Sequence, residues 1–109
     1  LRGRELGRVM AHKVRWTPDA LGDLAEIGEH IAQDDPDAAF KVGSQLLDHV
    51  RLLEGFPNIG PAYRWRHDGR VREILCLSYR IFYRVDDERK QVEILNIWHT
   101  SRAEPDFGK

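Results

Sequence analysis

The sequence has one cysteine, Cys76, and no long apolar run. A single cysteine cannot form an intramolecular disulfide, so we interpret Cys76 as a small buried hydrophobic residue of a protein from a reducing compartment. No apolar stretch approaches the about 20 residues that a transmembrane helix needs, which argues against a membrane-spanning protein. The N-terminal residues carry charges but lack the apolar region of a secretory signal, so we expect a cytoplasmic location.

Metal-ligand spacing, internal repeats and low-complexity segments are also lacking. The five histidines are scattered, and we predict neither a metal nor another cofactor. A length of 109 residues indicates one domain with one modest core. We interpret residues 1–12 as an N-terminal extension, with Met10 as a natural start, and hypothesise that its first nine residues are not native. Residues 13–109 then form the single domain.

Charge is divided along the chain, although the net charge is only −1. Residues 17–55 hold nine acidic residues against two basic ones, whereas residues 61–84 hold six arginines against two acidic residues. This division predicts a polarised molecule whose basic part could meet an acidic protein segment or a phosphate backbone. Ordinary solvated charge is the alternative interpretation.

Two helix start signals lie in the first half of the chain. Alternating residues predict a short strand over Lys13–Trp16. Thr17 and Asp35 are each followed by proline, which is the pattern of an N-cap with proline at the first helical position. Apolar residues at helical spacing predict helices over 18–33 and 36–54. Because the linking turn is short, we expect an antiparallel helical hairpin whose remaining apolar surface covers a sheet.

Three strands are predicted in the second half, over Val71–Leu77, Tyr79–Asp86 and Gln91–Trp98. Short connections favour antiparallel pairing between successive strands. The fold class that we predict is α+β, in the order β-α-α-β-β-β, with the two-helix hairpin packed on a small antiparallel sheet. In the middle strand we expect the face of Ile81 under the helices and the face of Arg80 exposed and basic.

These segments resemble the RelE/ParE toxins of bacterial toxin–antitoxin modules. The sequence segments from the predicted sheet are Val71-Arg-Glu-Ile-Leu, Tyr79-Arg-Ile-Phe-Tyr-Arg-Val-Asp and Val92-Glu-Ile-Leu-Asn-Ile-Trp-His. The upstream segments are Trp16-Thr-Pro-Asp-Ala-Leu-Gly-Asp-Leu and Leu53-Glu-Gly-Phe-Pro-Asn-Ile-Gly. The resemblance covers residues 13 to about 102. It implies a cytoplasmic, growth-arresting toxin that is neutralised by a cognate antitoxin, whose C-terminal segment wraps the toxin.

The superfamily has branches with different targets. The segments SYRIFYRVD and EILNIWH resemble those of the ParE-like, plasmid-stabilisation branch. This resemblance implies inhibition of DNA gyrase without catalysis by the toxin. The first alternative is a RelE-like endonuclease that cleaves mRNA in the ribosomal A site. A further alternative is an inactive toxin that acts only in a repressor complex, in which the antitoxin contacts the operator DNA.

The nuclease alternative implies catalytic roles for three residues. Arg80 resembles the arginine that meets the scissile phosphate, His99 the C-terminal general acid, and Tyr83 a proton donor. The strand phase favours core packing for Tyr83. The chain has only four lysines, whereas RelE-like sites are rich in them, and this difference counts against cleavage.

The favoured interpretation has no catalytic residue and uses basic and aromatic residues to bind the target or antitoxin. Part of this set interleaves aromatic and basic groups, as nucleotide-stacking surfaces do. The predicted binding residues are Arg64, Trp65, Arg66, Arg72, Arg80, Arg84, His99 and Arg102.

Overall fold

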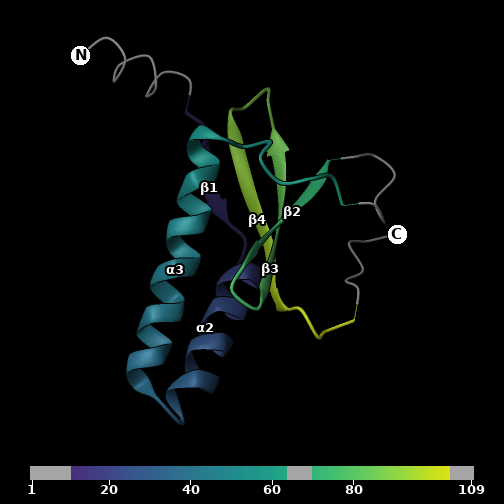
Figure 1. Cartoon of the computed structure of the whole chain (residues 1–109). Helices are drawn as coiled ribbons and strands as arrows, with labels where there is room; N and C mark the ends of the chain where they lie inside the picture. Colours follow the sequence, from purple (N-terminus) through teal and green to yellow (C-terminus); the bar gives the residue numbers. More distant parts are fainter. Residues whose placement is uncertain (1–10, 64–69, 104–109) are drawn as a thin grey trace, which may run out of the picture.

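The computed structural model describes residues 11–63 and 70–103 (Figure 1). Its elements follow the order β1 (Lys13–Trp16), α2 (Pro18–Ala32), α3 (Pro36–Gly55), β2 (Val71–Cys76), β3 (Tyr79–Asp86) and β4 (Gln91–His99). The predicted order is therefore confirmed, and each boundary lies within one residue of its predicted position. No helix among the described residues is long and apolar enough to cross a membrane.

The four strands form one mixed sheet in the order β1-β4-β3-β2. Strands β2, β3 and β4 pair antiparallel, as the short turns require. The prediction of a wholly antiparallel sheet is wrong at β1, which pairs parallel to β4, from Lys13 opposite Gln91 to Trp16 opposite Ile94. Tight turns dictate antiparallel pairing only for the strands that they join, and the whole helical hairpin separates β1 from the other strands.

Both helices begin at side-chain caps. The Thr17 hydroxyl accepts from the Ala20 backbone N–H at 3.2 Å and donates to the Ile94 carbonyl at 2.7 Å, so it ties the start of α2 to β4. The Asp35 carboxylate accepts from the Ala38 N–H at 3.1 Å and starts α3. These contacts satisfy N–H groups that the first helical turn leaves without partners.

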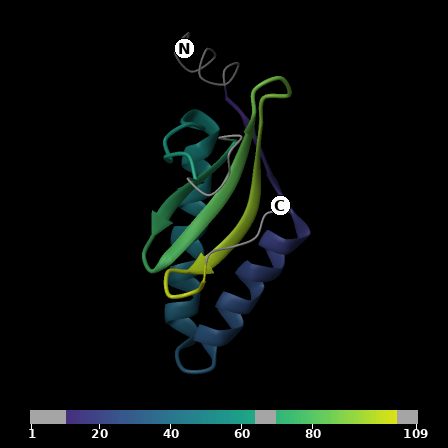
Figure 2. The same ribbon diagram turned by 90° about the vertical axis from the view of Figure 1, so that its right-hand side faces the viewer.

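The main core lies between the helical hairpin and one face of the sheet (Figures 1 and 2). Leu46, Val50 and Leu53 of α3 are buried there, together with Ile81 and Tyr83 of β3. The predicted placement of the Ile81 face under the helices is confirmed. The far end of the hairpin extends beyond the sheet (Figure 1).

A second core lies on the other face of the sheet, which we expected to be exposed and basic. Tyr63, Val71 and Phe82 are buried there, with Leu95 and Trp98 packed against them. Phe82 has no exposed surface. The predicted alternation of faces holds, since Phe82 lies opposite Ile81 and Tyr83. The expected exposure is wrong because Tyr63, from the segment before β2, packs on Phe82, and side chains of β4 pack against them.

His12 belongs to the folded structure, one residue before the predicted domain boundary. Its side chain is buried, and its backbone N–H donates to the Glu54 carbonyl at 2.9 Å. Its Nε2 atom lies 3.4 Å from a carboxylate oxygen of Asp87 in the β3–β4 hairpin. The rest of the predicted N-terminal extension, except Ala11, lies outside the described residues.

Candidate functional site

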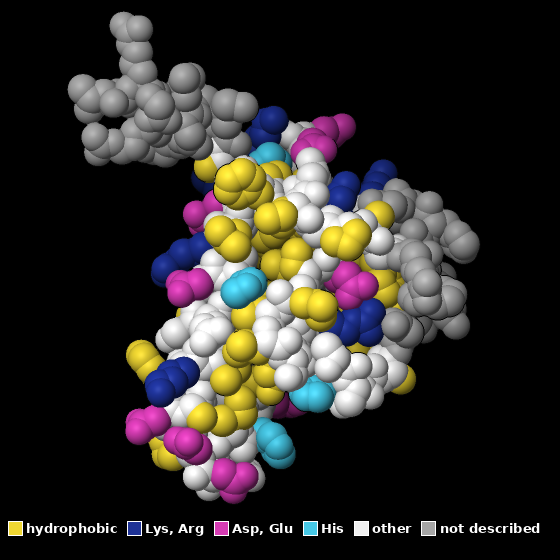
Figure 3. Space-filling model, viewed as in Figure 1, with side chains coloured by type: hydrophobic (Ala, Val, Ile, Leu, Met, Phe, Trp, Pro, Cys, Tyr) yellow, Lys and Arg dark blue, Asp and Glu magenta, His cyan; other side chains and the backbone are white. Residues whose placement is uncertain are grey.

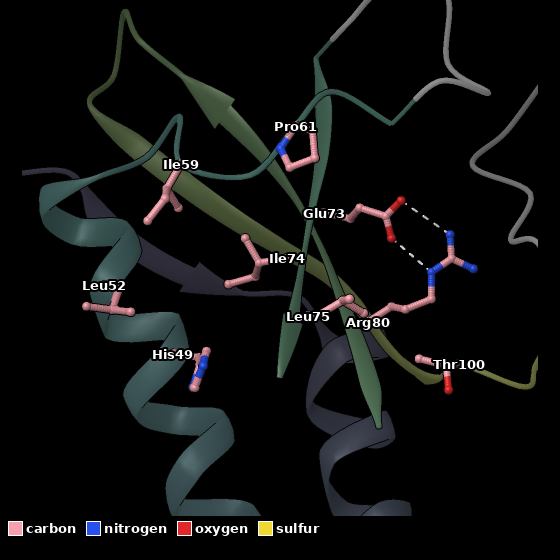
Figure 4. A pocket seen from close by; sticks show the side chains of 9 residues that line it. All are labelled: His49, Leu52, Ile59, Pro61, Glu73, Ile74, Leu75, Arg80 and Thr100. Carbon is pink, nitrogen blue, oxygen red and sulfur yellow. Dashed lines mark hydrogen bonds and ion pairs between the residues drawn. The ribbon is translucent and has the colours of Figure 1, made fainter. Parts of the chain in front are cut away.

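A groove of about 750 Å³ lies between α3 and the edge of the sheet (Figures 3 and 4). Side chains from α3, the loop after it, β2, β3 and the segment after β4 meet there. The lining residues are His49, Leu52, Ile59, Pro61, Glu73, Ile74, Leu75, Arg80 and Thr100.

Apolar side chains dominate the groove and its surroundings. Leu75 of β2 is 64% exposed, and Leu52 and Ile59 are also exposed at the groove. Figure 3 shows hydrophobic side chains gathered on this face of the molecule. An exposed apolar patch with a polar margin is typical of a protein interaction site. None of these apolar residues was among the predicted binding residues, because the sequence pattern alone does not distinguish an exposed apolar residue from one in the core.

Strand β2 is an edge of the sheet, and only its first half is covered. Tyr63 N–H donates to the Val71 carbonyl at 2.6 Å, and Glu73 N–H donates to the Pro61 carbonyl at 3.2 Å. Within residues 11–63 and 70–103, no other segment pairs with the outer edge of β2 beyond Glu73. The backbone at Leu75 can therefore accept an additional strand beside the apolar groove.

Arg80 lies at one end of the groove, where it is paired with Glu73 (Figure 4). Arg80 Nε donates to one carboxylate oxygen at 2.9 Å, and Nη2 donates to the other at 3.3 Å. The Arg80 guanidinium carbon also lies 4.8 Å from the ring centroid of Phe82. The Arg80 side chain is only 14% exposed. Arg80 is therefore a partly buried cation in contact with Glu73 and Phe82, and it does not form part of an exposed basic surface.

Arg72 holds the loop that follows α3. Its guanidinium donates to the Gly60 carbonyl at 2.6 Å, and the Tyr83 hydroxyl accepts from the Gly60 N–H at 2.9 Å. A Cβ atom on Gly60 would come within 2.5 Å of the Glu73 carbonyl, so this position requires glycine. Because Arg72 opposes Tyr83 in the register, it lies on the face of the sheet opposite Arg80, and the two arginines do not form one basic surface.

Tyr83 is buried under the sheet, and this burial changes its acidity. Desolvation raises the pKa of Tyr83, while the bond from Gly60 and the positive charge of Arg72 lower it by smaller amounts. The Tyr83 hydroxyl is thus kept neutral and engaged with the loop. Its placement agrees with core packing.

His49 and Cys76 form a contact that the sequence did not suggest. His49 Nδ1 lies 3.2 Å from Cys76 Sγ and 3.0 Å from the Gln45 carbonyl oxygen. A carbonyl oxygen only accepts, so its bond places a proton on Nδ1. Burial raises the pKa of the Cys76 thiol, which remains protonated at neutral pH. The two residues are 27 positions apart, and only the packing of α3 on β2 brings them together.

His99 lies at the end of β4, away from the groove. Ser101 N–H donates to His99 Nδ1 at 3.1 Å, so the neutral imidazole carries its proton on Nε2. The His99 ring meets Tyr79 edge to face, at 5.5 Å between centroids. With Tyr79 it lines a second cavity, of about 360 Å³, which α2 borders through Asp23 and His30.

The remaining predicted binding residues occupy separate places. The Arg102 guanidinium carbon lies 3.5 Å from the ring centroid of Trp98. Arg84 pairs with Glu93 at 3.5 Å, and Arg15 reaches the same carboxylate at 3.3 Å. Arg64, Trp65 and Arg66 lie outside the described residues. Among the described residues, no group of three or more His, Cys, Asp or Glu side chains could hold a metal ion.

Comparisons with known proteins agree on a family. A family model described as the ParE toxin of the type II toxin–antitoxin system parDE matches residues 14–104. A candidate toxin of Sinorhizobium fredii, Y4kP, is 36% identical over 95 residues, which cover 85% of this chain and 93% of that protein.

Solved structures of the same fold include toxins of two kinds. The RelBE2 toxin–antitoxin complex of Mycobacterium tuberculosis matches at 25% identity and a TM-score of 0.63, over 82% of this chain and 98% of that one. The chromosomal ParDE system of P. aeruginosa matches at 24% identity and 0.67, over 83% and 97%. A mutant of E. coli RelE in the free state matches at 20% identity and 0.62, over 83% and 84%.

Proposed function

The chain belongs to the ParE toxin family of type II toxin–antitoxin systems, within the RelE/ParE superfamily, and we propose that it arrests growth by binding a target rather than by cutting one. The favoured target is DNA gyrase, inhibited in the cytoplasm in a ParE-like manner. A cognate antitoxin, encoded beside the toxin, keeps it inactive.

The observation that carries this proposal is the separation of the three residues that a nuclease would need together. Arg80 opposes Trp98 in the β3–β4 register, and His99 opposes Tyr79. Neighbouring residues of a strand point to opposite faces, so Arg80 and His99 leave the sheet on opposite sides. Tyr83 is buried, with its hydroxyl bound to the Gly60 backbone. General acid catalysis requires hydrogen-bond reach to one reacting phosphate, which this arrangement does not favour.

The groove beside α3 supports the second part of the proposal, which concerns the antitoxin. Two of the solved relatives, RelBE2 and ParDE, are toxin–antitoxin systems. In this chain the apolar groove lies next to the uncovered edge of β2. An extended antitoxin segment could add a strand at Leu75 and place apolar side chains against Leu52 and Ile59. This occupant would remove from water the apolar patch that the free toxin exposes.

Controlled expression in bacteria tests the proposal. Expression of the chain alone should arrest growth, and co-expression with the neighbouring antitoxin frame should restore it. Messenger RNA from the arrested cells should show no new cuts at ribosomal A sites. Growth without arrest would favour an inactive toxin that serves only in a repressor complex, and A-site cuts would favour the RelE-like nuclease.

A further inference from the structure

The Arg80–Glu73 contact has the geometry of an occupied oxyanion site. Two donors on one edge of the Arg80 guanidinium, Nε and Nη2, reach the two oxygens of one carboxylate at 2.9 and 3.3 Å (Figure 4). Parallel bonds of this kind are the way in which arginine binds a carboxylate or a phosphate group. In this fold the acceptor is the chain's own side chain, supplied by the neighbouring strand.

Arg80 is held in place by more than its partner. Its guanidinium carbon lies 4.8 Å from the ring centroid of Phe82 and 6.0 Å from that of Tyr63. Both rings belong to the buried cluster on this face of the sheet. The attraction of a cation to an aromatic ring acts on the Arg80 guanidinium independently of its carboxylate partner. The donor edge of Arg80 is therefore preorganised.

Glu73 is the more exposed member of the pair. Its side chain is 25% exposed, against 14% for Arg80, and it stands on the edge strand β2. Its backbone is fixed by the bond to Pro61, whereas its carboxylate reaches Arg80 through two methylene groups. Both side chains line the groove, so a ligand in the groove would meet this carboxylate beside Arg80.

A second acidic residue on the same sheet provides the contrast. Glu93 contacts two arginines, Arg15 at 3.3 Å and Arg84 at 3.5 Å, and both of these arginines are more exposed than Arg80. Each is a single long contact in a region open to water, where ion pairs contribute little. Glu93 thus serves as a control for an acidic residue that does not fill a preorganised site.

We propose that Arg80 forms an oxyanion-binding site at the end of the groove and that Glu73 is its internal ligand. The site takes a carboxylate group, and the incoming carboxylate must displace that of Glu73. Free anions are then excluded from the site, whereas a segment that also fills the apolar groove can enter it. The natural ligand would be an acidic side chain of the antitoxin, and this assignment rests on the proposed function. The existence of the site does not depend on the proposed function.

Nuclear magnetic resonance of the arginine side chains tests the site without any assumption about the target. The Nε–Hε signal of Arg80 is assigned by its loss in Arg80→Lys. Sodium acetate and inorganic phosphate are then titrated separately, at constant ionic strength, into the wild type, Glu73→Gln and Glu93→Gln. In Glu73→Gln the Arg80 signal should shift saturably with acetate, with an affinity about tenfold or more above that of the wild type. In Glu93→Gln the Arg80 signal should behave as in the wild type.

Three results would overturn the proposal. One is an Arg80 signal in Glu73→Gln that ignores acetate, and another is a wild-type signal that responds as strongly as the variant. Saturation by phosphate but not by acetate would refute the carboxylate assignment. If Glu73→Gln does not fold, Glu73→Asp is the second variant, because it withdraws the carboxylate from Arg80 by one methylene. Acetate should then shift the Arg80 signal in the same direction but by less. An Arg80 signal in Glu73→Asp that does not respond to acetate would also refute the proposal. Loss of toxin activity in cells would bear on the proposed function alone.

Discussion

Arg80 and His99 leave opposite faces of the sheet, although their strands are neighbours and their positions differ by one step in register. Arg80 lines the groove beside α3, and His99 lines the cavity beside α2. A chain that bound its target with two separate surfaces could use both residues. A chain that cleaved one phosphodiester would need them at the same atom.

The effects of Arg80→Ala and His99→Ala should therefore be independent. We expect the double variant to lose the sum of the free energies that the two single variants lose in target binding, measured by titration calorimetry. Residues that act as one catalytic unit are strongly non-additive, since removing either one removes most of the activity. A double variant no worse than the poorer single variant would contradict the separation.

Leu75→Glu should weaken neutralisation by the antitoxin without unfolding the toxin. Leu75 is exposed, so the substitution leaves the core intact, but it puts a charge on the wall of an apolar groove. We expect the affinity for the cognate antitoxin to fall about tenfold to a hundredfold, as for a central interface residue. The matched control is Leu21→Glu, on α2, which is also exposed and does not line the groove. Equal losses in both variants, measured by surface plasmon resonance, would argue against the groove as the docking site.

Phe82→Ala should be strongly destabilising, because the second face of the sheet carries a core. Phe82 meets Tyr63 and Trp98 edge to face, at 5.3 and 6.4 Å between ring centroids. Removal of a buried phenylalanine side chain lowers the free energy of unfolding by about 3–5 kcal/mol. Urea denaturation would measure the loss. A change as small as that of an exposed residue would show that this face is open, as the strand pattern alone had predicted.

The sequence was most informative where local chemistry decides the structure. Thr17 and Asp35, each followed by proline, placed both helices because a cap and a fixed φ act within a few residues. Turns of two to four residues placed the three antiparallel strands for the same reason. The parallel partner of β1 could not be predicted, since nothing local links Lys13–Trp16 to β4.

The candidate site was harder to predict because its residues meet only through tertiary packing. The pairing of Arg80 with Glu73 depends on the β2–β3 register, and the apolar groove depends on how α3 lies beside β2. The face of the sheet on which Arg72 lies depends on the same register. The alternation of faces placed Phe82 opposite Ile81 correctly, but the cover that Tyr63 and Trp98 give Phe82 depends on tertiary packing, which the pattern of residue types does not show.

Tyr83→Phe should remove one source of instability at alkaline pH. Burial raises the pKa of Tyr83 above its ordinary value of 10.0, so the folded chain holds this proton more tightly than the unfolded chain. The corresponding stability is fully present below pH 10.0 and is lost as the pH rises through the raised pKa.

The variant should show a weaker decline of unfolding free energy above that pH. At neutral pH it should be less stable by about 1–3 kcal/mol, since the Gly60 N–H loses its acceptor. Urea titrations from pH 7 to pH 11 would measure both effects. If the unfolding free energy of the wild type and of the variant fell equally at alkaline pH, the raised pKa of Tyr83 would not be the source of the decline.

We propose above all that this toxin acts by binding and that its favoured target is DNA gyrase. The most direct measurement is ATP-dependent supercoiling of a relaxed plasmid by purified gyrase, with increasing amounts of the purified chain. Supercoiling should be inhibited at amounts of the chain near those of gyrase, and the cognate antitoxin should reverse the inhibition. Full supercoiling at such amounts, together with mRNA cut in the A site of translating ribosomes, would contradict the proposal.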